Sequence, residues 1–157
     1  MKIKVYNRQE AETISHRFIP HVWISIRDPG APPAKIEENH DCKGILRQYF
    51  DDITLDFIEQ SRARLGTLED KKAFNLDAYK PMTAEHAKEI IDFVNKYKDE
   101  VELICIHCEA GMCRSAGTAS ALSLWLNGYE GKDVEHTQPQ YPNSWVKSLI
   151  LREINAL

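Results

Sequence analysis

A cysteine and an arginine lie six residues apart in this 157-residue chain, and together they could serve a phosphate group. The stretch that holds them reads His107-Cys108-Glu109-Ala110-Gly111-Met112-Cys113-Arg114-Ser115. Only the thiolate of a cysteine attacks, and a helix N-terminus or a guanidinium lowers the thiol pKa that controls it. The planar fork of Arg114 can bind two phosphoryl oxygens, which lysine does poorly. Ser115 can donate its hydroxyl to the sulfur of Cys108 and ease its departure.

The flanking segments indicate a loop between a strand and a helix. Leu103-Ile104-Cys105-Ile106 is a short apolar run typical of a buried parallel strand, and residues 114–127 are expected to form a helix that ends at Gly128. A glycine and a small residue let the loop N–H groups point into one concavity at a positive helix end, which binds anions. We expect His107 and Glu109 to hold the shape of the loop. The expected phosphate-binding residues are Glu109, Ala110, Gly111, Met112, Cys113 and Arg114.

The pattern H-C-x5-R-S resembles the signature of the cysteine-dependent protein tyrosine phosphatase superfamily, and the short chain is similar to its dual-specificity branch. The resemblance implies a protein tyrosine phosphatase-like fold. It also implies hydrolysis of phosphate monoesters through a phosphocysteine intermediate, without a metal or another cofactor. The substrate would be a phosphorylated protein or a small phosphate ester. The alternatives are an arsenate reductase-like enzyme and a phosphate-binding module that use the same anion loop.

A second candidate site follows residues 44–50, which we predict to be a strand. Ligands of parallel sheets bind beyond the carboxyl ends of the strands, so Asp51 and Asp52 should share a crevice with the cysteine loop. The leaving oxygen needs a proton and the later hydrolysis needs a base. The run Phe50-Asp51-Asp52 resembles the acid loop of small phosphatases in this superfamily, which assigns both roles to Asp52. Asp51 as a helix cap and Asp77 as a rival acid remain open, because residues 54–79 lengthen the interval before Cys108.

The cysteines also allow a core, redox or metal-binding role. Cys108 could be an ordinary core cysteine, and Cys105-Ile106-His107-Cys108 is formally a C-x-x-C redox or half-zinc motif. Strand alternation turns Cys105 and His107 the same way, and no second pair completes a four-ligand site, so we expect no metal. The Cys108-x4-Cys113 spacing resembles that of the low-molecular-weight tyrosine phosphatases. Cys113 is therefore either a redox partner of Cys108 or only a small residue that suits the loop.

The remaining sequence predicts an α/β domain with a small, mainly parallel sheet flanked by helices. Ile3 and Val5 alternate with lysines, which predicts a half-exposed edge strand. A second strand is predicted over residues 22–26, which include Trp23. The proline-rich residues 27–33 can only be a loop. We expect this loop to connect two strands, and the alternative is that it forms part of the rim of the substrate cleft. Thr83 is expected to cap a helix with a regular apolar stripe, and Asn143 or Ser144 to cap the last one. Further helices are expected over 9–15 and 54–65.

Length and charge limit the classes of function. We expect residues 1–157 to form one domain. Twenty basic and twenty-four acidic residues, with no block of like charge, predict binding to neither nucleic acid nor a membrane surface. Residues 1–6 contain no apolar stretch of signal-peptide length, and no eighteen apolar residues run together, so we expect neither a signal peptide nor a membrane span. Three of the four cysteines cluster around one loop. These features predict a cytoplasmic protein in a reducing compartment.

Overall fold

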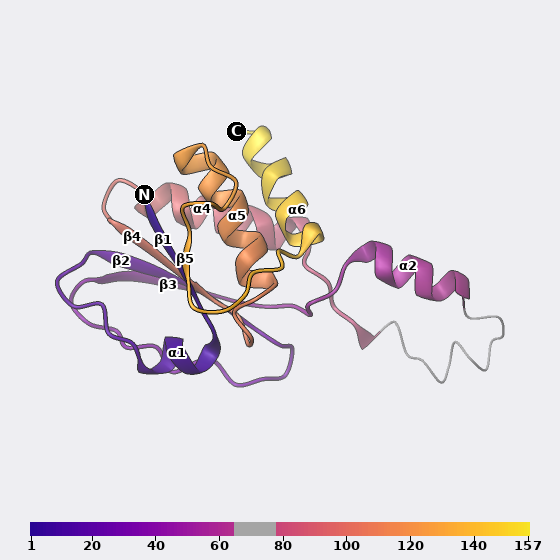
Figure 1. Ribbon diagram of the computed structural model, residues 1–157, viewed down its shortest axis with the longest axis horizontal. Coiled ribbons are helices and arrows are strands. Elements are labelled where there is room, and N and C mark those ends of the chain that lie inside the picture. Colours follow the sequence, from indigo (N-terminus) through magenta and orange to yellow (C-terminus); the bar gives the residue numbers. More distant parts are fainter. Residues whose placement is uncertain (65–77) are drawn as a thin grey trace.

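The computed structural model describes residues 1–64 and 78–157 of the chain. In this part of the chain, five parallel strands form one sheet in the spatial order β3-β2-β4-β1-β5 (Figure 1). The strands are β1 (Lys2–Tyr6), β2 (His21–Arg27), β3 (Cys42–Tyr49), β4 (Leu103–His107) and β5 (Glu135–His136). The described helices are α1 (Arg8–Thr13), α2 (Leu55–Arg64), α4 (Ala84–Tyr97), α5 (Arg114–Asn127) and α6 (Ser144–Asn155).

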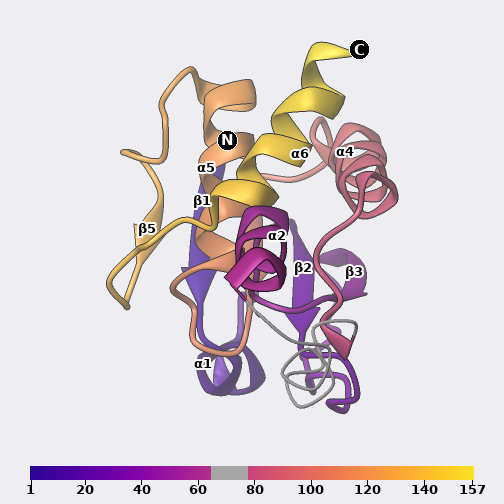
Figure 2. The same cartoon turned by 90° about the vertical axis from the view of Figure 1, so that its right-hand side faces the viewer.

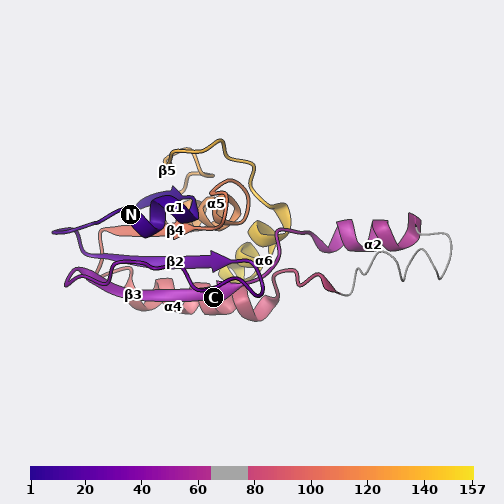
Figure 3. The same ribbon diagram turned by 90° about the horizontal axis from the view of Figure 1, so that it is seen from below.

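Helices cover both faces of the sheet. α4, α5 and α6 lie together on one face, and α1 lies on the other (Figures 1 and 2). Seen from below, β2 and β3 run side by side, and α2 extends away from the layers beyond the carboxyl end of β3 (Figure 3). The predicted α/β fold, with a small parallel sheet flanked by helices, is confirmed.

The central strands are apolar on both faces because both faces are covered. Val22 and Ile24 of β2 join the core beneath α4, α5 and α6, whereas Trp23 packs on the α1 side. Every residue of β4 is buried, including Cys105 and His107. Alternate side chains of a strand point to opposite faces, so a doubly covered strand reads as a continuous apolar run. The short run before the cysteine loop therefore indicated a strand correctly.

The helix ends follow their capping residues. Thr83 and His86 form a capping box at the start of α4, and the side chain of Asn143 accepts the N–H groups of Trp145 and Val146 at the start of α6. α5 and α6 approach closely at Gly117, where a Cβ atom would lie 2.7 Å from the carbonyl oxygen of Asn143. None of the described helices has the length and apolar character needed to cross a membrane.

The prediction of an edge strand at Ile3 and Val5 was wrong. β1 lies between β4 and β5, and both side chains are fully buried. The strand that covers its outer side, β5, has two residues, which is too short to show an alternating pattern. The helix expected over 54–65 spans Leu55–Arg64 in the described residues, and its predicted end at residue 65 lies outside them.

The buried His16 gives the fold a dependence on pH. The ring nitrogen Nε2 of His16 lies 3.0 Å from the hydroxyl of Tyr6, and burial, followed by the charges of His21 and Lys4, lowers the pKa of His16 to about 4. An unfolded histidine has a pKa of about 6.5, so between these values protons bind the unfolded chain preferentially. We expect the free energy of unfolding to fall as the pH drops from about 6.5 towards 4. His16→Gln, which keeps an acceptor for Tyr6, should show a smaller fall in urea titrations at pH 7 and 4.5. An equal fall in both proteins would contradict the assignment.

Candidate active site

The carboxyl ends of four strands meet at one edge of the sheet. The register aligns Tyr6 with His107, Ser25 with His107, and Arg27 with Tyr49, so the segments that follow β1, β2, β3 and β4 begin at similar heights. Ligands of parallel sheets bind in the crevice beyond these ends. The cysteine loop, which joins β4 to α5, therefore begins where the other three segments can reach it.

Two polar groups contact the sulfur of Cys108. The backbone N–H of Gly111 donates to Sγ at 3.2 Å, and the Ser115 hydroxyl lies 3.1 Å from it. Cys108 is buried, and α5 begins at Arg114 just beyond the loop, so the positive end of the helix adds to these contacts. These contacts hold the sulfur at the start of the loop, next to the N-terminus of α5. The arrangement suits a nucleophilic sulfur.

The loop carbonyls are held by the segment before α6. Gln140 Nε2 donates to the oxygen of Gly111 at 2.8 Å, Tyr141 N to that of Met112 at 2.8 Å, and Asn143 N to that of Cys113 at 2.9 Å. Successive carbonyls that point to one side leave their amide groups for the other side. The N–H groups of Met112, Cys113 and Arg114 have no protein acceptor among residues 1–64 and 78–157. They are therefore available to an anion.

The guanidinium of Arg114 is held from one side only. Its Nη1 donates to the carbonyl oxygen of Phe50 at 2.8 Å and lies 2.7 Å from Oδ1 of Asp28. Its Nε is buried and has no hydrogen-bond partner within the described part of the chain. A buried donor without a partner costs about 1–3 kcal/mol, which an anion bound at this edge would recover. The side chain is 6% exposed, so its charge is almost fully removed from solvent.

The three candidate acids lie in different surroundings. Oδ1 of Asp52 accepts from the Asn143 side-chain amide at 2.9 Å, which brings Asp52 to the C-terminal end of the cysteine loop. Oδ2 of Asp51 accepts from the Lys80 backbone at 2.6 Å, while its own N–H donates to Lys80 O. Asp51 therefore ties the segment after β3 to the segment before α4. Asp77 lies outside the described residues.

His107 and Glu109 hold the two ends of the loop. His107 Nε2 lies 2.6 Å from the Ser25 hydroxyl, and its Nδ1 lies 3.1 Å from Cys108 O. Burial lowers the pKa of His107, which keeps the ring neutral at pH 7. Glu109 pairs with Arg8 at 3.0 Å, and Arg8 N donates to Glu109 O. These contacts attach the loop to β2 and to the start of α1.

Burial raises the pKa of each of the other three cysteines. Burial raises the pKa of Cys105, and burial followed by the Asp52 carboxylate raises the pKa of Cys113 to about 11. All four cysteines lie within the described residues, and all are free thiols. No group of three or more histidine, cysteine, aspartate or glutamate side chains is arranged to hold a metal ion within residues 1–64 and 78–157. The C-x-x-C interpretation gains no support from this geometry.

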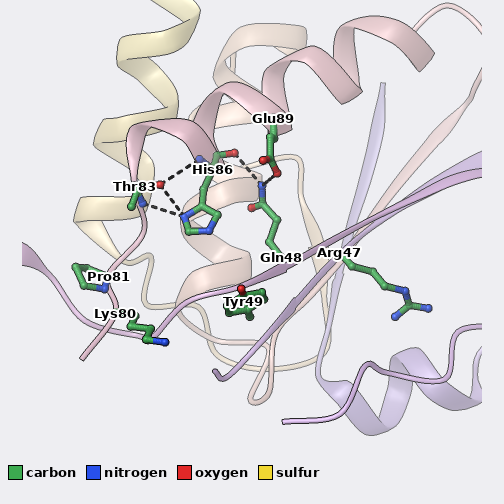
Figure 4. Close-up of a pocket in the computed structure, with 8 residues that line it drawn as sticks. All are labelled: Arg47, Gln48, Tyr49, Lys80, Pro81, Thr83, His86 and Glu89. Carbon is green, nitrogen blue, oxygen red and sulfur yellow. Dashed lines mark hydrogen bonds between the residues drawn. The ribbon is translucent and has the colours of Figure 1, made fainter. Parts of the chain in front are cut away.

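Two hollows lie beside the site. One, of about 500 Å³, is lined by Asp52 and Cys113 together with exposed faces of Phe57, Tyr79 and Tyr141. A larger hollow, of about 640 Å³, lies between the end of β3 and the start of α4 (Figure 4).

His86 faces the larger hollow. Its Nδ1 accepts the N–H of Thr83, and its ring lies against Phe50 with the ring centroids 5.3 Å apart. His86 therefore caps α4, and its ring packs against Phe50, whose carbonyl oxygen accepts from Arg114.

Comparison with known proteins identifies the fold. No protein-family model and no curated protein matches the chain. The crystal structure of Tk-PTP in the active form matches with a TM-score of 0.52 and 14% sequence identity, covering 99% of this chain and 92% of that one. The chain has the protein tyrosine phosphatase fold. PTPMT1 matches with a TM-score of 0.45 and 12% identity over the same shares of the two chains.

Sequence reasoning missed two parts of this phosphatase-fold site. Asp28, placed in a connector, contacts the guanidinium of Arg114. An acid that follows a strand is part of the signal that singled out Asp52, and this part also applies to Asp28. Gln140 and Asn143 hold the loop carbonyls, and only the capping role of Asn143 was visible in the sequence.

Gly111 is the residue of the loop that tolerates replacement least. Its φ is +69°, and a Cβ atom would lie 2.6 Å from Asn7 N, at the junction of β1 and α1. We expect Gly111→Ala to lower the free energy of unfolding by about 3 kcal/mol or more, from backbone strain and overpacking together. Gly128→Ala is the matched control, because Gly128 has φ +76° with nothing within 4 Å. It should lose about 1 kcal/mol in urea titrations. Equal losses would show that the contact with Asn7 is not limiting.

Proposed function

We propose that this protein is a phosphate-monoester hydrolase, a protein tyrosine or dual-specificity phosphatase that acts through a phosphocysteine intermediate without a metal. Residues 1–157 would form one catalytic domain. Cys108 is the nucleophile, and Arg114 and the loop amides of Glu109, Ala110, Gly111, Met112 and Cys113 bind the phosphoryl oxygens. Asp52 transfers protons, Ser115 assists the sulfur, and His107 holds the loop.

The donor arrangement around Cys108 and Arg114 carries this proposal. The sulfur of Cys108 accepts the N–H of Gly111 and lies 3.1 Å from the Ser115 hydroxyl. The same loop has amide groups without acceptors, and the buried Nε–H of Arg114 has no partner in the described chain. On a guanidinium, Nε and Nη2 share one edge and can bind two oxygens of one phosphoryl group. Preorganised donors of this kind stabilise the charge that develops in phosphoryl transfer.

The chemistry then follows in two steps. The thiolate of Cys108 attacks phosphorus, the ester P–O bond breaks, and the leaving oxygen takes a proton from Asp52. Water next attacks the phosphocysteine while Asp52 accepts a proton, the S–P bond breaks, and phosphate leaves with the thiolate restored. Ser115, which lies 3.1 Å from the sulfur, can donate to it as it departs. Asp52 thus acts first as an acid and then as a base.

The surroundings of the site favour hydrolysis over the alternatives. Arsenate reduction through a second thiol needs Cys113 as a thiolate, and the pKa of Cys113, raised to about 11, makes that form scarce at neutral pH. A binding module needs no proton carrier beside the loop, yet Asp52 is held there by Asn143. The exposed rings of Phe57 and Tyr141 beside Asp52 support an aryl phosphate such as phosphotyrosine as the substrate.

The covalent mechanism is tested by Cys108→Ser. We expect this variant to release no measurable phosphate from para-nitrophenyl phosphate, because a serine hydroxyl is a poor nucleophile at neutral pH. Acid-quenched parent enzyme should carry a phosphoryl group on Cys108, detected by mass spectrometry of its peptides. Cys42→Ser, at a cysteine far from the loop, is the control and should keep its activity. Appreciable turnover by Cys108→Ser would remove the mechanism.

The role of Asp52 is tested by the leaving group. Asp52→Asn should slow hydrolysis of phenyl phosphate by about 10²-fold or more, and hydrolysis of an activated aryl ester far less, because a good leaving group hardly needs the proton. Asp51→Asn is the matched neighbour, since an asparagine oxygen can still accept from the Lys80 backbone. If the leaving-group dependence appears with Asp51→Asn or Asp77→Asn instead, the acid is assigned to the wrong residue.

A further inference from the structure

One edge of the sheet is long and unpaired. β3, the outermost strand on its side, has eight residues, whereas β5, the outermost strand on the other side, has two (Figure 3). Edge strands are usually short, covered or interrupted by proline, because their free backbone groups pair with other chains. β3 contains no proline and no acidic residue. Its length and composition therefore allow a further strand to be added.

The register with β2 shows which backbone groups of β3 point outward. Arg27 pairs with Tyr49, and Phe50 N donates to Arg27 O. Successive residues of a strand direct their N–H and C=O groups to opposite sides. Ile45, Arg47 and Tyr49 therefore direct theirs away from β2, and these groups have no hydrogen-bond partner within residues 1–64 and 78–157. An extended peptide supplies the partners that such an edge lacks.

A buried acceptor without a donor lies beside the same edge. Gln48 of β3 is 2% exposed and lines the hollow of about 640 Å³ between β3 and α4 (Figure 4). Its Nε2 donates to His86 O at 2.9 Å and lies 3.3 Å from Oε2 of Glu89, which fixes the orientation of the amide. Its Oε1 has no partner in the described part of the chain. A buried acceptor left unpaired is unfavourable, so this oxygen suits a ligand that brings an N–H group.

His86 supplies a donor to the same hollow. Its Nδ1 accepts the N–H of Thr83, so the proton of the neutral ring is on Nε2. Burial lowers the pKa of His86, which keeps the ring neutral at pH 7. Nε2 has no acceptor among the described residues. An acceptor on Gln48 and a donor on His86 match a carboxamide, whereas an ammonium group brings donors only.

The charges of the edge distinguish between occupants. The charged side chains of β3 are Lys43 and Arg47, which are both basic and exposed, and Lys80 lines the hollow. Addition of a second copy of this chain would bring two basic strands together, and like charges on facing strands are destabilising. An acidic segment is attracted instead. The acid in the lining of the hollow, Glu89, is already next to the Gln48 amide.

We propose that the outer edge of β3 binds an extended acidic segment of a partner protein by strand addition, with an asparagine or glutamine side chain of that segment in the hollow at Gln48. The site lies outside the cysteine loop, so the proposal does not depend on hydrolysis by Cys108. β3 leads directly into Phe50, whose carbonyl contacts Arg114, so a partner held here lies close to the crevice.

The experiment titrates the full isotope-labelled chain with acetyl-Thr-Gln-Glu-Val-Thr-Glu-amide and with the peptide of reversed sequence, which together cover both strand directions. We expect one peptide to shift the backbone amide signals of Ile45, Arg47 and Tyr49 and the side-chain amide signal of Gln48. Leucine in place of the peptide glutamine should weaken binding by about fivefold, because Oε1 loses its donor. Binding of neither peptide, or binding that leaves these signals unchanged, would overturn the proposal.

Methylated peptides separate strand addition from attraction of charge alone. N-methyl groups on the peptide edge that faces β3 should abolish measurable binding, because they remove the donors of the ladder. The same number of N-methyl groups on the opposite edge, which is the matched control, should change it little. Equal effects from the two edges would show that no strand is added.

A charge reversal tests the partner's chemistry. Arg47→Glu should weaken binding of the acidic peptide by about tenfold and strengthen binding of a peptide with lysine in place of both glutamates. Lys132→Glu makes the same change of net charge at an exposed lysine near β5 and should alter neither affinity. Thermal unfolding of both variants checks the fold. Equal losses in the two variants, or a dimer in sedimentation that the peptide dissociates, would overturn the proposal, the dimer because it assigns the edge to a second copy.

Discussion

The buried guanidinium of Arg114 is the constraint on which the rest of the site depends. A charge taken out of water must be paired and hydrogen-bonded, or the fold would lose several kcal/mol. Two acceptors meet one of its nitrogens, from Asp28 after β2 and from the Phe50 carbonyl after β3. The arginine itself follows the loop after β4. Satisfying one side chain therefore brings three strand ends together, and the unpaired edge of that side chain defines where an anion can bind.

The shape of the cysteine loop depends on the directions in which its carbonyl and amide groups point. Gln140, Tyr141 and Asn143 take the carbonyls on one side, so the amides are turned to the other. Gly111 lets the loop lie directly against the junction of β1 and α1, where no side chain would fit. The loop is thus shaped by segments from both ends of the chain. Its amide geometry is a tertiary property, although the residues that use it are consecutive in the sequence.

This division explains what the sequence could predict. The strand before Cys108, the helix from Arg114 to Asn127 and the cap at Thr83 depend on neighbouring residues, and local patterns located them correctly. The contact between Asp28 and Arg114 joins residues far apart in the chain, and no spacing rule connects them. β5 was not predicted, because a strand of two residues shows no alternation of polar and apolar residues. The contacts of residues 140–143 with the loop were not predicted, because two of the donors are backbone N–H groups and the third, the side chain of Gln140, lies 29 residues along the chain from its acceptor.

Three carboxylates lie around the proposed anion site, and their partners differ. Asp28 pairs with Arg114, and Glu109 pairs with Arg8, so each negative charge faces a guanidinium. Asp52 instead accepts from the neutral amide of Asn143. A proton carrier must change its charge twice in each turnover, and a carboxylate in an ion pair would break that pair each time. A neutral amide can stay bonded to either form, because the carboxyl group keeps an acceptor oxygen when it is protonated. The neutral partner of Asp52 thus supports its proposed role in proton transfer, whereas Asp28 and Glu109 each pair with an arginine.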